Sequence, residues 1–513
     1  MERLHDACGI VGIYARENGD SIDVRRYLTL ALTALQHRGQ ESAGMAVYNS
    51  ENNIVSRVAM GKVREVFSDM GTGLPETHCG IGHVRYSTTG SSCVENAGPF
   101  VVGTHPNHYE AIAVAHNGNL VNGPALRAEL PQELLYSTTD SEAIALLLLQ
   151  SDGTTLRERM ISVFPMLRGA YSLVILAGGK LYAMRDPWGM RPLCLGRIGE
   201  SWIVASESCA LDRVGADFVR KVEPGELITI DEQGMRGEIL AAGVPLPGVP
   251  LPRQALCVFE YIYFSDATTK LNGRYVYNVR EALGRELARE HPVAADLVVP
   301  VPDSSIPAAL GYAQTSGIAY GQAIIKNRYS DRTFIKPDQR LRQLEVDLKF
   351  NLVRPKIEGV RLVIVDDSIV RGNTMKRLVA ALRHYGAKEI HLRSSAPPLR
   401  HPCHFGIDIP QEVELIASGR SVQEVADYIG VDSLAYLSIA ELGRAISSAA
   451  GGEDSSIDDD AAIAGLHREF CYGCMEKQGW PFDPIGAIDP VGAARSAQFI
   501  APGKRNSAIQ GVQ

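Results

Sequence analysis

Residues 363–374 have the side chains that would hold a phosphorylated sugar. Their apolar start predicts a buried strand, which ends in two acidic residues, Asp366 and Asp367. Gly372 and Thr374 then open a predicted helix, and the backbone N–H groups of a helix N-terminus bind phosphate. The two carboxylates can accept hydrogen bonds from ribose hydroxyls or hold a divalent cation. The alternative interpretation is a capped strand-to-helix turn with two surface acids.

Cys8 stands at the start of the first predicted strand, where it could act as a nucleophile. A cysteine attacks a carbonyl carbon as its thiolate, so it needs a nearby base or a lowered pKa. The apolar residues that follow Cys8 suit a small buried hydrophobe equally well. Taken alone, the residues around Cys8 leave both interpretations open.

Four further cysteines could hold a metal centre or form a redox pair. Cys471 and Cys474 make a C-x-x-C pair, whereas Cys257 and Cys403 stand far apart in the chain. Tetrahedral zinc, a redox dithiol and an iron–sulfur cluster all use such thiols, and one C-x-x-C does not decide among them. Nine cysteines among 513 residues are too sparse for a disulfide scaffold and suit a reducing compartment.

A proline-rich connector at residues 243–254 divides the predicted elements into two groups. Before it, short apolar runs alternate with Gly, Asn and Asp turns, and one amphipathic helix is expected at residues 24–36. This pattern predicts a sandwich of sheets. The expected strands are residues 9–15, 43–48, 81–86, 111–115 and 172–177.

Beyond the connector, continuous apolar strands alternate with helices, which predicts a parallel sheet covered on both faces. The expected elements are a helix at 275–290, a strand at 296–301, a helix at 306–316, a strand at 361–365 and a helix at 375–385. Residues 421–448 look helical, and residues 451–460 are expected to form an acidic loop in solvent.

The charge balance and the hydropathy exclude some classes of partner. With 51 basic and 59 acidic side chains, the net charge is -8, which argues against nucleic acid or an anionic membrane. No stretch approaches the roughly 20 apolar residues of a spanning helix, and the N-terminus has no apolar signal-peptide core. We therefore expect a soluble, cytoplasmic protein.

Four segments of the first half resemble the N-terminal-nucleophile (Ntn) glutamine amidotransferases, namely residues 36–42, 82–88, 116–120 and 138–142. In that family the chain is cut so that the cysteine becomes residue one. Its own α-amino group, with an ordinary pKa of about 7.7–8.0, is then the general base. Removal of Met1 alone would leave Cys8 internal, so the resemblance implies that residues 1–7 are a propeptide.

The same resemblance implies roles in glutamine hydrolysis. Cys8 would be the nucleophile on the amide carbon. Asn117 and the N–H of Gly118 would form the oxyanion hole. Arg85 would pair with the carboxylate of the substrate, and Asp140 with its ammonium group.

Residues 363–374 resemble the phosphoribosyl-pyrophosphate motif of type I phosphoribosyltransferases, and residues 301–305 resemble the pyrophosphate loop of that family. The substrate-binding residues that this implies are Asp366, Asp367, Ser368, Arg371, Gly372, Asn373 and Thr374. The implied ligands of Mg²⁺ are Ser304, Asp366 and Asp367.

Residues 329–349 form a long polar connection and predict a lid over this site. Lys326 and Lys349 flank the lid and match lysines that meet the pyrophosphate in the amidotransferase branch of the family. The lid departs from the family pattern at Asp347, where a basic residue is more usual.

Apart from its tail, the whole chain resembles the glutamine phosphoribosylpyrophosphate amidotransferases of purine synthesis. This resemblance implies an α+β Ntn-hydrolase sandwich in residues 8–242, a linker at 243–256, and an α/β type I phosphoribosyltransferase domain in 257–485, with 486–513 a mobile tail. It also implies that ammonia released from glutamine displaces pyrophosphate from phosphoribosyl pyrophosphate, giving 5-phosphoribosylamine.

Cys257, Cys403, Cys471 and Cys474 match the iron–sulfur subclass of this family, which implies a structural [4Fe-4S] cluster rather than zinc. The family is usually a homotetramer inhibited by purine nucleotides.

Two alternatives differ in function. A non-enzymatic sensor of phosphoribosyl pyrophosphate would not need the glutaminase residues, and residues 363–374 argue against an amidotransferase with another partner domain.

Overall fold

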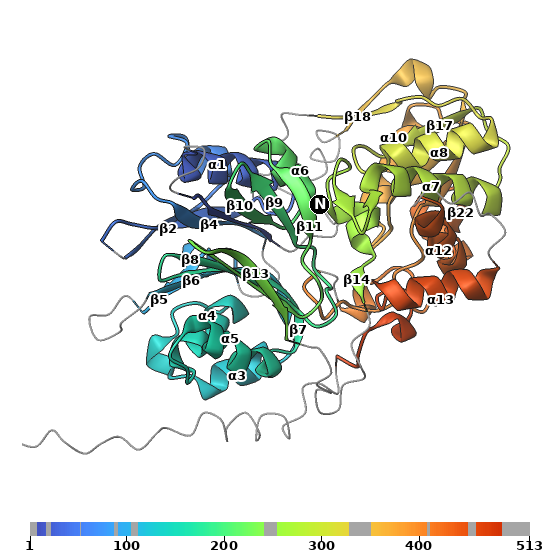
Figure 1. The fold of residues 1–513 in the computed structure, drawn as a ribbon. Coiled ribbons are helices and arrows are strands. Elements are labelled where there is room, and N and C mark those ends of the chain that lie inside the picture. Colours follow the sequence, from blue (N-terminus) through green and yellow to red (C-terminus); the bar gives the residue numbers. More distant parts are fainter. Residues whose placement is uncertain are drawn as a thin grey trace, which may run out of the picture.

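The computed structural model describes residues 8–16, 22–51, 53–86, 91–103, 111–240, 254–327, 350–407, 411–449 and 458–484. Two halves lie side by side in Figure 1, the first coloured blue to green and the second yellow-green to red. The predicted propeptide, lid and tail, Lys349, and all of the predicted connector except Gln254 lie outside these ranges. Within the described ranges, no helix is long and apolar enough to cross a bilayer.

Two antiparallel sheets form the centre of the first half. The larger has the strand order β11-β9-β10-β1-β4-β2-β3, and the smaller has the order β13-β12-β8-β7-β6-β5. The strands of the larger sheet are β1 (Gly9–Tyr14), β2 (Ser42–Tyr48), β3 (Ile54–Met60), β4 (Cys79–Arg85), β9 (Cys194–Ile198), β10 (Ser201–Ala205) and β11 (Asp217–Lys221). Those of the smaller sheet are β5 (Phe100–Val102), β6 (Ile112–Leu120), β7 (Gly169–Ala177), β8 (Lys180–Arg185), β12 (Glu226–Asp231) and β13 (Gly234–Ile239).

A shared apolar layer holds the two sheets face to face. Ile10 and Ile81 of the larger sheet are buried in it together with Val174 and Leu181 of the smaller one. Gly12 allows this close approach, because a Cβ there would lie only 2.5 Å from a methyl carbon of Val174. Both faces of these strands are covered, one by the other sheet and one by helices, which explains why their sequences are short continuous apolar runs.

Helices cover the outer faces, which gives four layers in the order α-β-β-α (Figure 1). The helices on the larger sheet are α1 (Val24–Ala34), α2 (Val63–Val66) and α6 (Ser208–Arg213). Those on the smaller sheet are α3 (Gly123–Glu129), α4 (Asp140–Gln150) and α5 (Leu156–Val163). The five strands and the helix that the sequence predicts in this half are confirmed.

A four-stranded parallel sheet with the order β17-β20-β21-β22 forms the centre of the second half. Its strands are β17 (Leu297–Pro300), β20 (Arg361–Asp366), β21 (Glu389–Ser394) and β22 (Ser433–Tyr436). Three short pairs lie outside it: β14 (Leu256–Cys257) with β23 (Phe470–Cys471), β15 (Lys270–Leu271) with β16 (Arg274–Tyr275), and β18 (Ile324–Lys326) with β19 (Phe350–Leu352).

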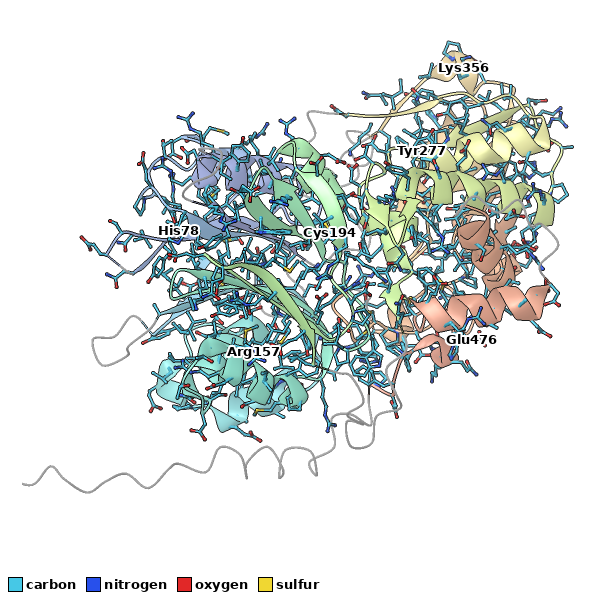
Figure 2. The ribbon with its side chains drawn as sticks, viewed as in Figure 1. His78, Arg157, Cys194, Tyr277, Lys356 and Glu476 are labelled. Atoms are coloured by element: carbon cyan, nitrogen blue, oxygen red, sulfur yellow. The ribbon has the colours of Figure 1, made fainter. Side chains whose placement is uncertain are left out.

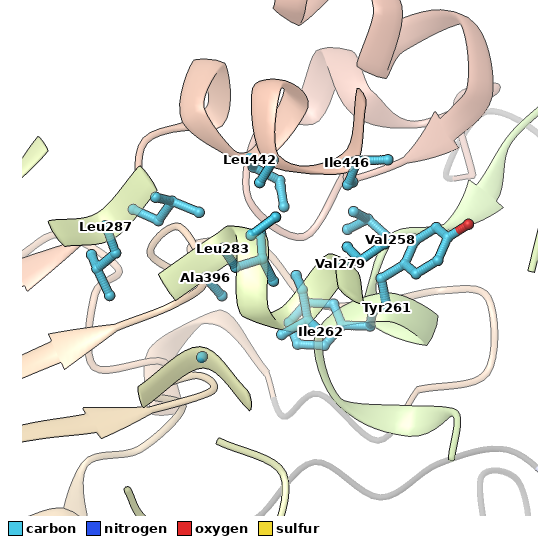
Figure 3. Close-up of a cluster of buried hydrophobic side chains, with 14 of the residues drawn as sticks. Val258, Tyr261, Ile262, Val279, Leu283, Leu287, Ala396, Leu442 and Ile446 are labelled. Carbon is cyan, nitrogen blue, oxygen red and sulfur yellow. The ribbon is translucent and has the colours of Figure 1, made fainter. Parts of the chain in front are cut away.

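Helices cover both faces of the parallel sheet, as the sequence predicts. One side carries α7 (Val276–Glu290), α8 (Ile306–Ser316), α12 (Ile439–Ser448) and, beyond α12, α13 (Asp459–Glu469). The other side carries α10 (Asn373–His384) and α11 (Val422–Ile429). Figure 3 shows Leu283 of α7 packed towards Leu442 and Ile446 of α12. Short helical turns complete the chain: η1 (Val94–Asn96), η2 (Gln132–Leu134), η3 (Phe164–Met166), η4 (Glu260–Phe264), η5 (Arg354–Lys356), η6 (Glu412–Glu414) and η7 (Lys477–Gly479).

Two sequence predictions in the second half are wrong. The helix expected at 421–448 is split, because Gly430 takes a left-handed conformation (φ 88°) that ends α11, and β22 then pairs with β21. The acidic loop expected at 451–460 ends early, since Asp458 accepts a hydrogen bond from the N–H of Ala461 and caps α13. Asp459 and Asp460 lie in the first turn of that helix, where negative charge is favourable.

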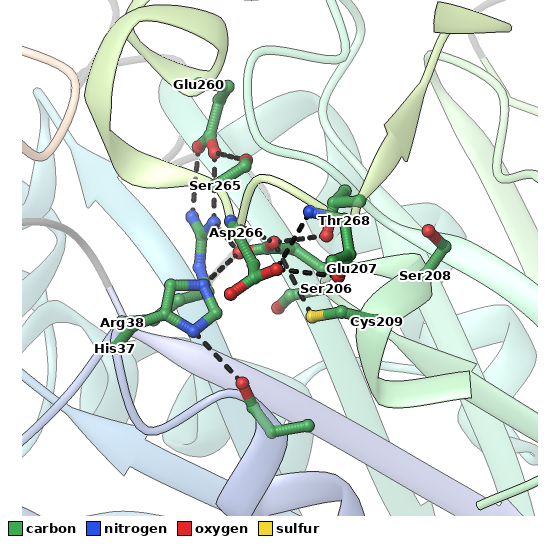
Figure 4. A network of polar contacts seen from close by, with 12 residues as sticks. His37, Arg38, Ser206, Glu207, Ser208, Cys209, Glu260, Ser265, Asp266 and Thr268 are labelled. Carbon is green, nitrogen blue, oxygen red and sulfur yellow. Dashed lines mark hydrogen bonds and ion pairs between the residues drawn. The ribbon is translucent and has the colours of Figure 1, made fainter. Parts of the chain in front are cut away.

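A buried ion network joins the two halves (Figure 4). The guanidinium of Arg38 is completely buried and donates from Nη1 and Nη2 to the two carboxylate oxygens of Glu260, each at 2.9 Å. Nη1 also donates to Glu207 at 2.6 Å, and Nε donates to the carbonyl oxygen of Cys8 at 3.2 Å. One side chain of the first half therefore binds both the second half and the backbone of Cys8.

The charges of this network balance within the protein. Nη1 of Arg191 lies 3.4 Å from Glu260, and the hydroxyl of Thr269 donates to Glu207 at 2.6 Å. Burial acts to raise the pKa of Glu260, but the Arg38 guanidinium outweighs it and leaves the pKa below its ordinary value. The carboxylates therefore stay ionised, and each has a positive partner.

We predict that Glu260→Gln lowers the free energy of unfolding by about 3–5 kcal/mol, because it leaves Arg38 buried with too little negative charge around it. Thermal unfolding followed by circular dichroism would measure the loss. Glu238→Gln is the matched control. It breaks a similar two-point pair with Arg157 of α5 (Figure 2), but that pair is in solvent and is worth less than about 1 kcal/mol. Equal losses in the two variants would contradict the prediction.

Candidate functional site

Cys8 lies directly before β1, at the junction of the two halves. It is buried, with 7% of its surface exposed, and its Sγ lies 3.8 Å from the carbonyl oxygen of Tyr86, just past the end of β4. Its own carbonyl oxygen accepts the hydrogen bond from Arg38. The N–H of Ile10 donates to the hydroxyl of Ser206 on the neighbouring strand segment, at 3.0 Å. These contacts fix the backbone on both sides of the thiol.

Asn117 and Gly118 lie on β6, which packs against β1 and β4 across the sandwich. The Asn117 side chain is completely buried, and neither its Nδ2 nor its Oδ1 has a hydrogen-bond partner within the described residues. A buried amide without partners costs about 1–3 kcal/mol, and a bound group that hydrogen-bonds to it would recover that cost. Gly118 has φ 150°, and a Cβ there would lie 1.9 Å from the carbonyl oxygen of Ala170. Only glycine fits this place.

Arg85 and Asp140 face the same region from β4 and α4. Nη1 of Arg85 donates to the carbonyl oxygen of Ser91 at 3.4 Å, and Asn96 donates to that same oxygen at 2.8 Å. Asn96 also accepts the N–H of Thr138, two residues before Asp140. Asn96 therefore links the loop that Arg85 contacts to the segment directly before Asp140.

Asp140 is held as a carboxylate. Its Oδ2 accepts the N–H of Leu120 at 2.8 Å, and its Oδ1 lies 3.7 Å from Nδ1 of His116. Burial acts to raise the pKa of Asp140, but His116 and the backbone donors outweigh it and lower the pKa. A buried, ionised carboxylate beside the Asn117–Gly118 backbone is suited to bind an ammonium group.

A second pocket lies at the carboxyl end of the parallel sheet, in the other half. Five of the predicted substrate-binding residues line it: Asp366, Asp367, Ser368, Gly372 and Thr374. Gly372 takes φ 76° directly before α10, and a Cβ there would lie 2.5 Å from Cδ1 of Ile416, so the turn requires glycine. The N–H groups of the helical turn that follows suit an anion. The pocket therefore combines two carboxylates with a helix N-terminus, as the sequence predicts.

The loop after β17 meets the strand-end acids. The hydroxyl of Ser304 donates to Asp367 at 2.5 Å, and that of Ser305 donates to Asp366 at 3.4 Å. Nζ of Lys326 donates to Asp303 at 2.6 Å. Neighbouring parallel strands end at the same edge of the sheet, which places residues 301–305 opposite residues 366–374.

Arg371 and Asn373 are not among the residues that line this pocket, and each pairs with another side chain. Arg371 pairs with Glu414, with Nε 2.8 Å from Oε2. Oδ1 of Asn373 accepts the hydroxyl of Tyr428 at 2.6 Å, and Nζ of Lys376 lies 4.2 Å from the Tyr428 ring centre. Tyr428 has no local sequence signal for this contact, because it stands 55 residues from Asn373.

The four predicted ligand cysteines surround one pocket, in which Met190, Arg191, Phe405, Ile407 and Trp480 are the other lining residues. Cys257 and Cys471 are opposite each other in the pair β14–β23, and Sγ of Cys403 accepts the N–H of Phe405 at 3.3 Å. All four are free thiols. Within the described ranges, no three His, Cys, Asp or Glu side chains are arranged to hold a single metal ion.

Burial raises the pKa of Cys257, and the nearby Arg191 acts against that rise. Burial likewise raises the pKa of Cys403 and Cys474. Thiolates in this pocket would therefore require positive charge beyond what Arg191 supplies. A bound metal centre would supply it.

Comparisons with known proteins divide the chain in the same way. A family profile described as a glutamine amidotransferase domain matches residues 98–213, and one described as a phosphoribosyl transferase domain matches residues 272–399. The amidophosphoribosyltransferase of Methanothermobacter thermautotrophicus is 46% identical over 480 residues, covering 92% of this chain and 94% of that protein. That of Mycobacterium tuberculosis is 44% identical over 447 residues, covering 85% of this chain and 82% of that protein.

Two solved structures share the fold. One, described as the allosteric regulatory enzyme of purine biosynthesis, has a TM-score of 0.81 and 39% identity, covering 92% of this chain and 95% of that chain. The other, glutamine phosphoribosylpyrophosphate amidotransferase from B. subtilis complexed with ADP and GMP, has a TM-score of 0.80 and 38% identity, covering 92% and 96%. The predicted fold class, an Ntn-hydrolase sandwich followed by a type I phosphoribosyltransferase domain, is confirmed. With both halves matched across nearly their whole length, the chain belongs to the amidophosphoribosyltransferase family.

Proposed function

We propose that this chain transfers ammonia from glutamine to C1 of phosphoribosyl pyrophosphate, forming 5-phosphoribosylamine, glutamate and pyrophosphate, the first committed step of purine synthesis. One observation supports this most strongly. In one half the chain carries a buried cysteine directly before β1 and an unpartnered buried amide on β6, which packs against β1. In the other half it carries carboxylates at a helix N-terminus. A sensor of phosphoribosyl pyrophosphate would need only the second site.

In the first half, Sγ of Cys8 would attack the amide carbon of glutamine. Ammonia leaves as a thioester forms, and water then cleaves the thioester to glutamate. The buried side chain of Asn117 and the N–H of Gly118 would stabilise the tetrahedral oxyanion, at about 3–4 kcal/mol for one donor. The α-amino group of Cys8 would carry the proton, which requires that residues 1–7 be removed first.

In the second half, the N–H groups at the start of α10 would hold the 5-phosphate. Asp366 and Asp367 would accept the ribose hydroxyls, oriented by Ser305 and Ser304. These carboxylates and the Ser304 hydroxyl are oxygen donors that suit Mg²⁺, which when bound would neutralise charge on the leaving pyrophosphate. Lys326, whose ammonium group is near the same loop, would also face the pyrophosphate.

We also propose that Cys257, Cys403, Cys471 and Cys474 hold a [4Fe-4S] cluster with a structural role. The four thiols line one pocket. A cluster is wider than one zinc ion and suits four thiols arranged around a cavity. The N–H of Phe405 already donates to one of these sulfurs, as in many cluster sites.

We propose further that the enzyme is a cytoplasmic homotetramer inhibited by purine nucleotides. The nine free thiols suit a reducing compartment. The family member from B. subtilis is described as complexed with ADP and GMP, which are purine nucleotides.

The first test measures pyrophosphate release with glutamine and with ammonia, using anaerobically prepared protein. We expect both to support release. Cys8→Ala should abolish the glutamine-dependent reaction and leave the ammonia-dependent one, while Cys79→Ala, which removes a buried thiol from the same sheet, should keep both. Intact mass of the active protein should lack residues 1–7. Release with neither nitrogen source would leave the sensor as the better hypothesis.

We predict that Asp367→Asn lowers turnover about 10- to 100-fold with either nitrogen source, because a neutral amide no longer accepts both the Ser304 hydroxyl and the substrate as a carboxylate does. Steady-state kinetics at varied phosphoribosyl pyrophosphate would measure this. Asp296→Asn is the control, since it lies at the opposite end of the paired strands and contacts Arg361. A loss with glutamine alone would place Asp367 outside the transferase site.

We predict that anaerobically purified protein contains about four irons and four inorganic sulfides per chain. Cys471→Ser should lower both contents and bleach the visible absorption of the cluster, whereas Cys209→Ser, a buried thiol of α6, should change neither. Metal and sulfide analysis would check this. Stoichiometric zinc without sulfide would contradict the cluster.

A further inference from the structure

A segment of the second half, residues 403–407, lies against the predicted oxyanion residues of the first half. The amide Nδ2 of Asn119 donates to the carbonyl oxygen of His404 at 2.9 Å. Gly406 takes φ 94°, and a Cβ there would lie 3.0 Å from the carbonyl carbon of Gly118. The segment thus touches the residue whose N–H would stabilise the oxyanion, and the residue next to it.

The end of β6 needs such support because only one of its edges is paired. β7 pairs with β6 along its whole length, up to Leu120 opposite Gly169. On the other edge, β5 pairs only with residues 112–114, and no described strand continues beside residues 115–120. Asn117 and Gly118 therefore lie on a strand end that the sheet holds from one side.

The same segment begins inside the cysteine-lined pocket. Cys403 and Phe405 line that pocket, and Nη2 of Arg191 donates to the carbonyl oxygen of Phe405 at 2.9 Å. Nη1 of Arg191 lies 3.4 Å from Glu260, which binds Arg38. Residues 403–407 are consequently fixed at one end by the pocket and by a buried cation, and at the other by Asn119.

We propose that residues 403–407 position the oxyanion hole of the glutaminase site, with Asn119 as the positioning residue. The proposal rests on the glutaminase function proposed above. An oxyanion donor acts only when it lies about 2.7–3.1 Å from the developing charge, and a displacement of about 1 Å can cost about 100-fold in rate. The hydrogen bond from Asn119 to His404 keeps the Gly118 N–H in place.

The test is Asn119→Ala in the full-length, processed enzyme. We expect kcat for glutamine hydrolysis to fall about 10- to 100-fold with KM for glutamine within twofold, because the loss is confined to the transition state. The rate of alkylation of Cys8 by iodoacetamide should stay within twofold of that of the unaltered enzyme, because this reaction displaces iodide and develops no oxyanion. Ammonia-dependent pyrophosphate release should be unchanged.

Asn122→Ala is the matched control. Its Nδ2 donates to the carbonyl oxygen of Met166 at 2.9 Å, a bond of the same kind and length made within the first half. It should leave kcat for glutamine unchanged. Gly406→Ala is a second variant, in which the added Cβ would press on the backbone of Gly118. It should also lower kcat for glutamine and leave KM within twofold.

Three outcomes would overturn the inference. An unchanged kcat in both Asn119→Ala and Gly406→Ala would show that the contact does not position the site. A parallel fall in the alkylation of Cys8 and in ammonia-dependent release would show a general structural role. Absence of glutamine hydrolysis in the unaltered enzyme would instead overturn the glutaminase function itself, and this inference with it.

Discussion

The pairing of Arg38 with Glu260 is the constraint on which the arrangement of the two halves depends. Moving either charge out of water costs several kcal/mol, so each must meet an opposite charge with good geometry. Arg38 and Glu207 come from the first half, whereas Glu260 and Thr269 come from the second. These four side chains satisfy one another only when the halves meet in one orientation. The network is therefore a device for specificity more than for stability.

That orientation matters for the proposed chemistry because the network ends at Cys8, the proposed nucleophile. Arg38 Nε holds the carbonyl oxygen of Cys8, and the N–H of Ile10 is held by Ser206. His37 extends the network, with Nε2 2.8 Å from Glu207. Burial acts to lower the pKa of His37, but Glu207 outweighs it and raises the pKa above its ordinary value. The result is a rigid, charged support beneath a thiol that must itself meet the substrate with little freedom.

The sequence predicts features whose residues follow one another along the chain. It gives no indication of contacts between residues that are far apart in the chain. Residues 363–374 could be interpreted because strand, acids, glycine and helix follow one another, and seven of these residues line one pocket. The strand β22 was missed because its few residues, between two amphipathic helices, do not interrupt a helical period. Arg38 belongs to a motif that was noticed, yet its role depends on Glu260, 222 residues away. The bond from Asn119 to His404 spans 285 residues and leaves no local trace.

Arg191 connects the cysteine-lined pocket to this network in electrostatic terms. It lies beside Glu260 on one side and lines the pocket with Cys257 and Cys403 on the other. Its positive charge acts to lower the pKa of both thiols against the effect of burial. If these sulfurs bind a cationic group as thiolates, that group offsets part of their charge, and Arg191 can remain with Glu260. If they become thiolates without that group, they compete with Glu260 for the guanidinium of Arg191. The ion network in which Arg38 binds the backbone of Cys8 would then be weaker. Arg191 is thus one buried cation shared by the cysteine-lined pocket and the network that holds the backbone of Cys8.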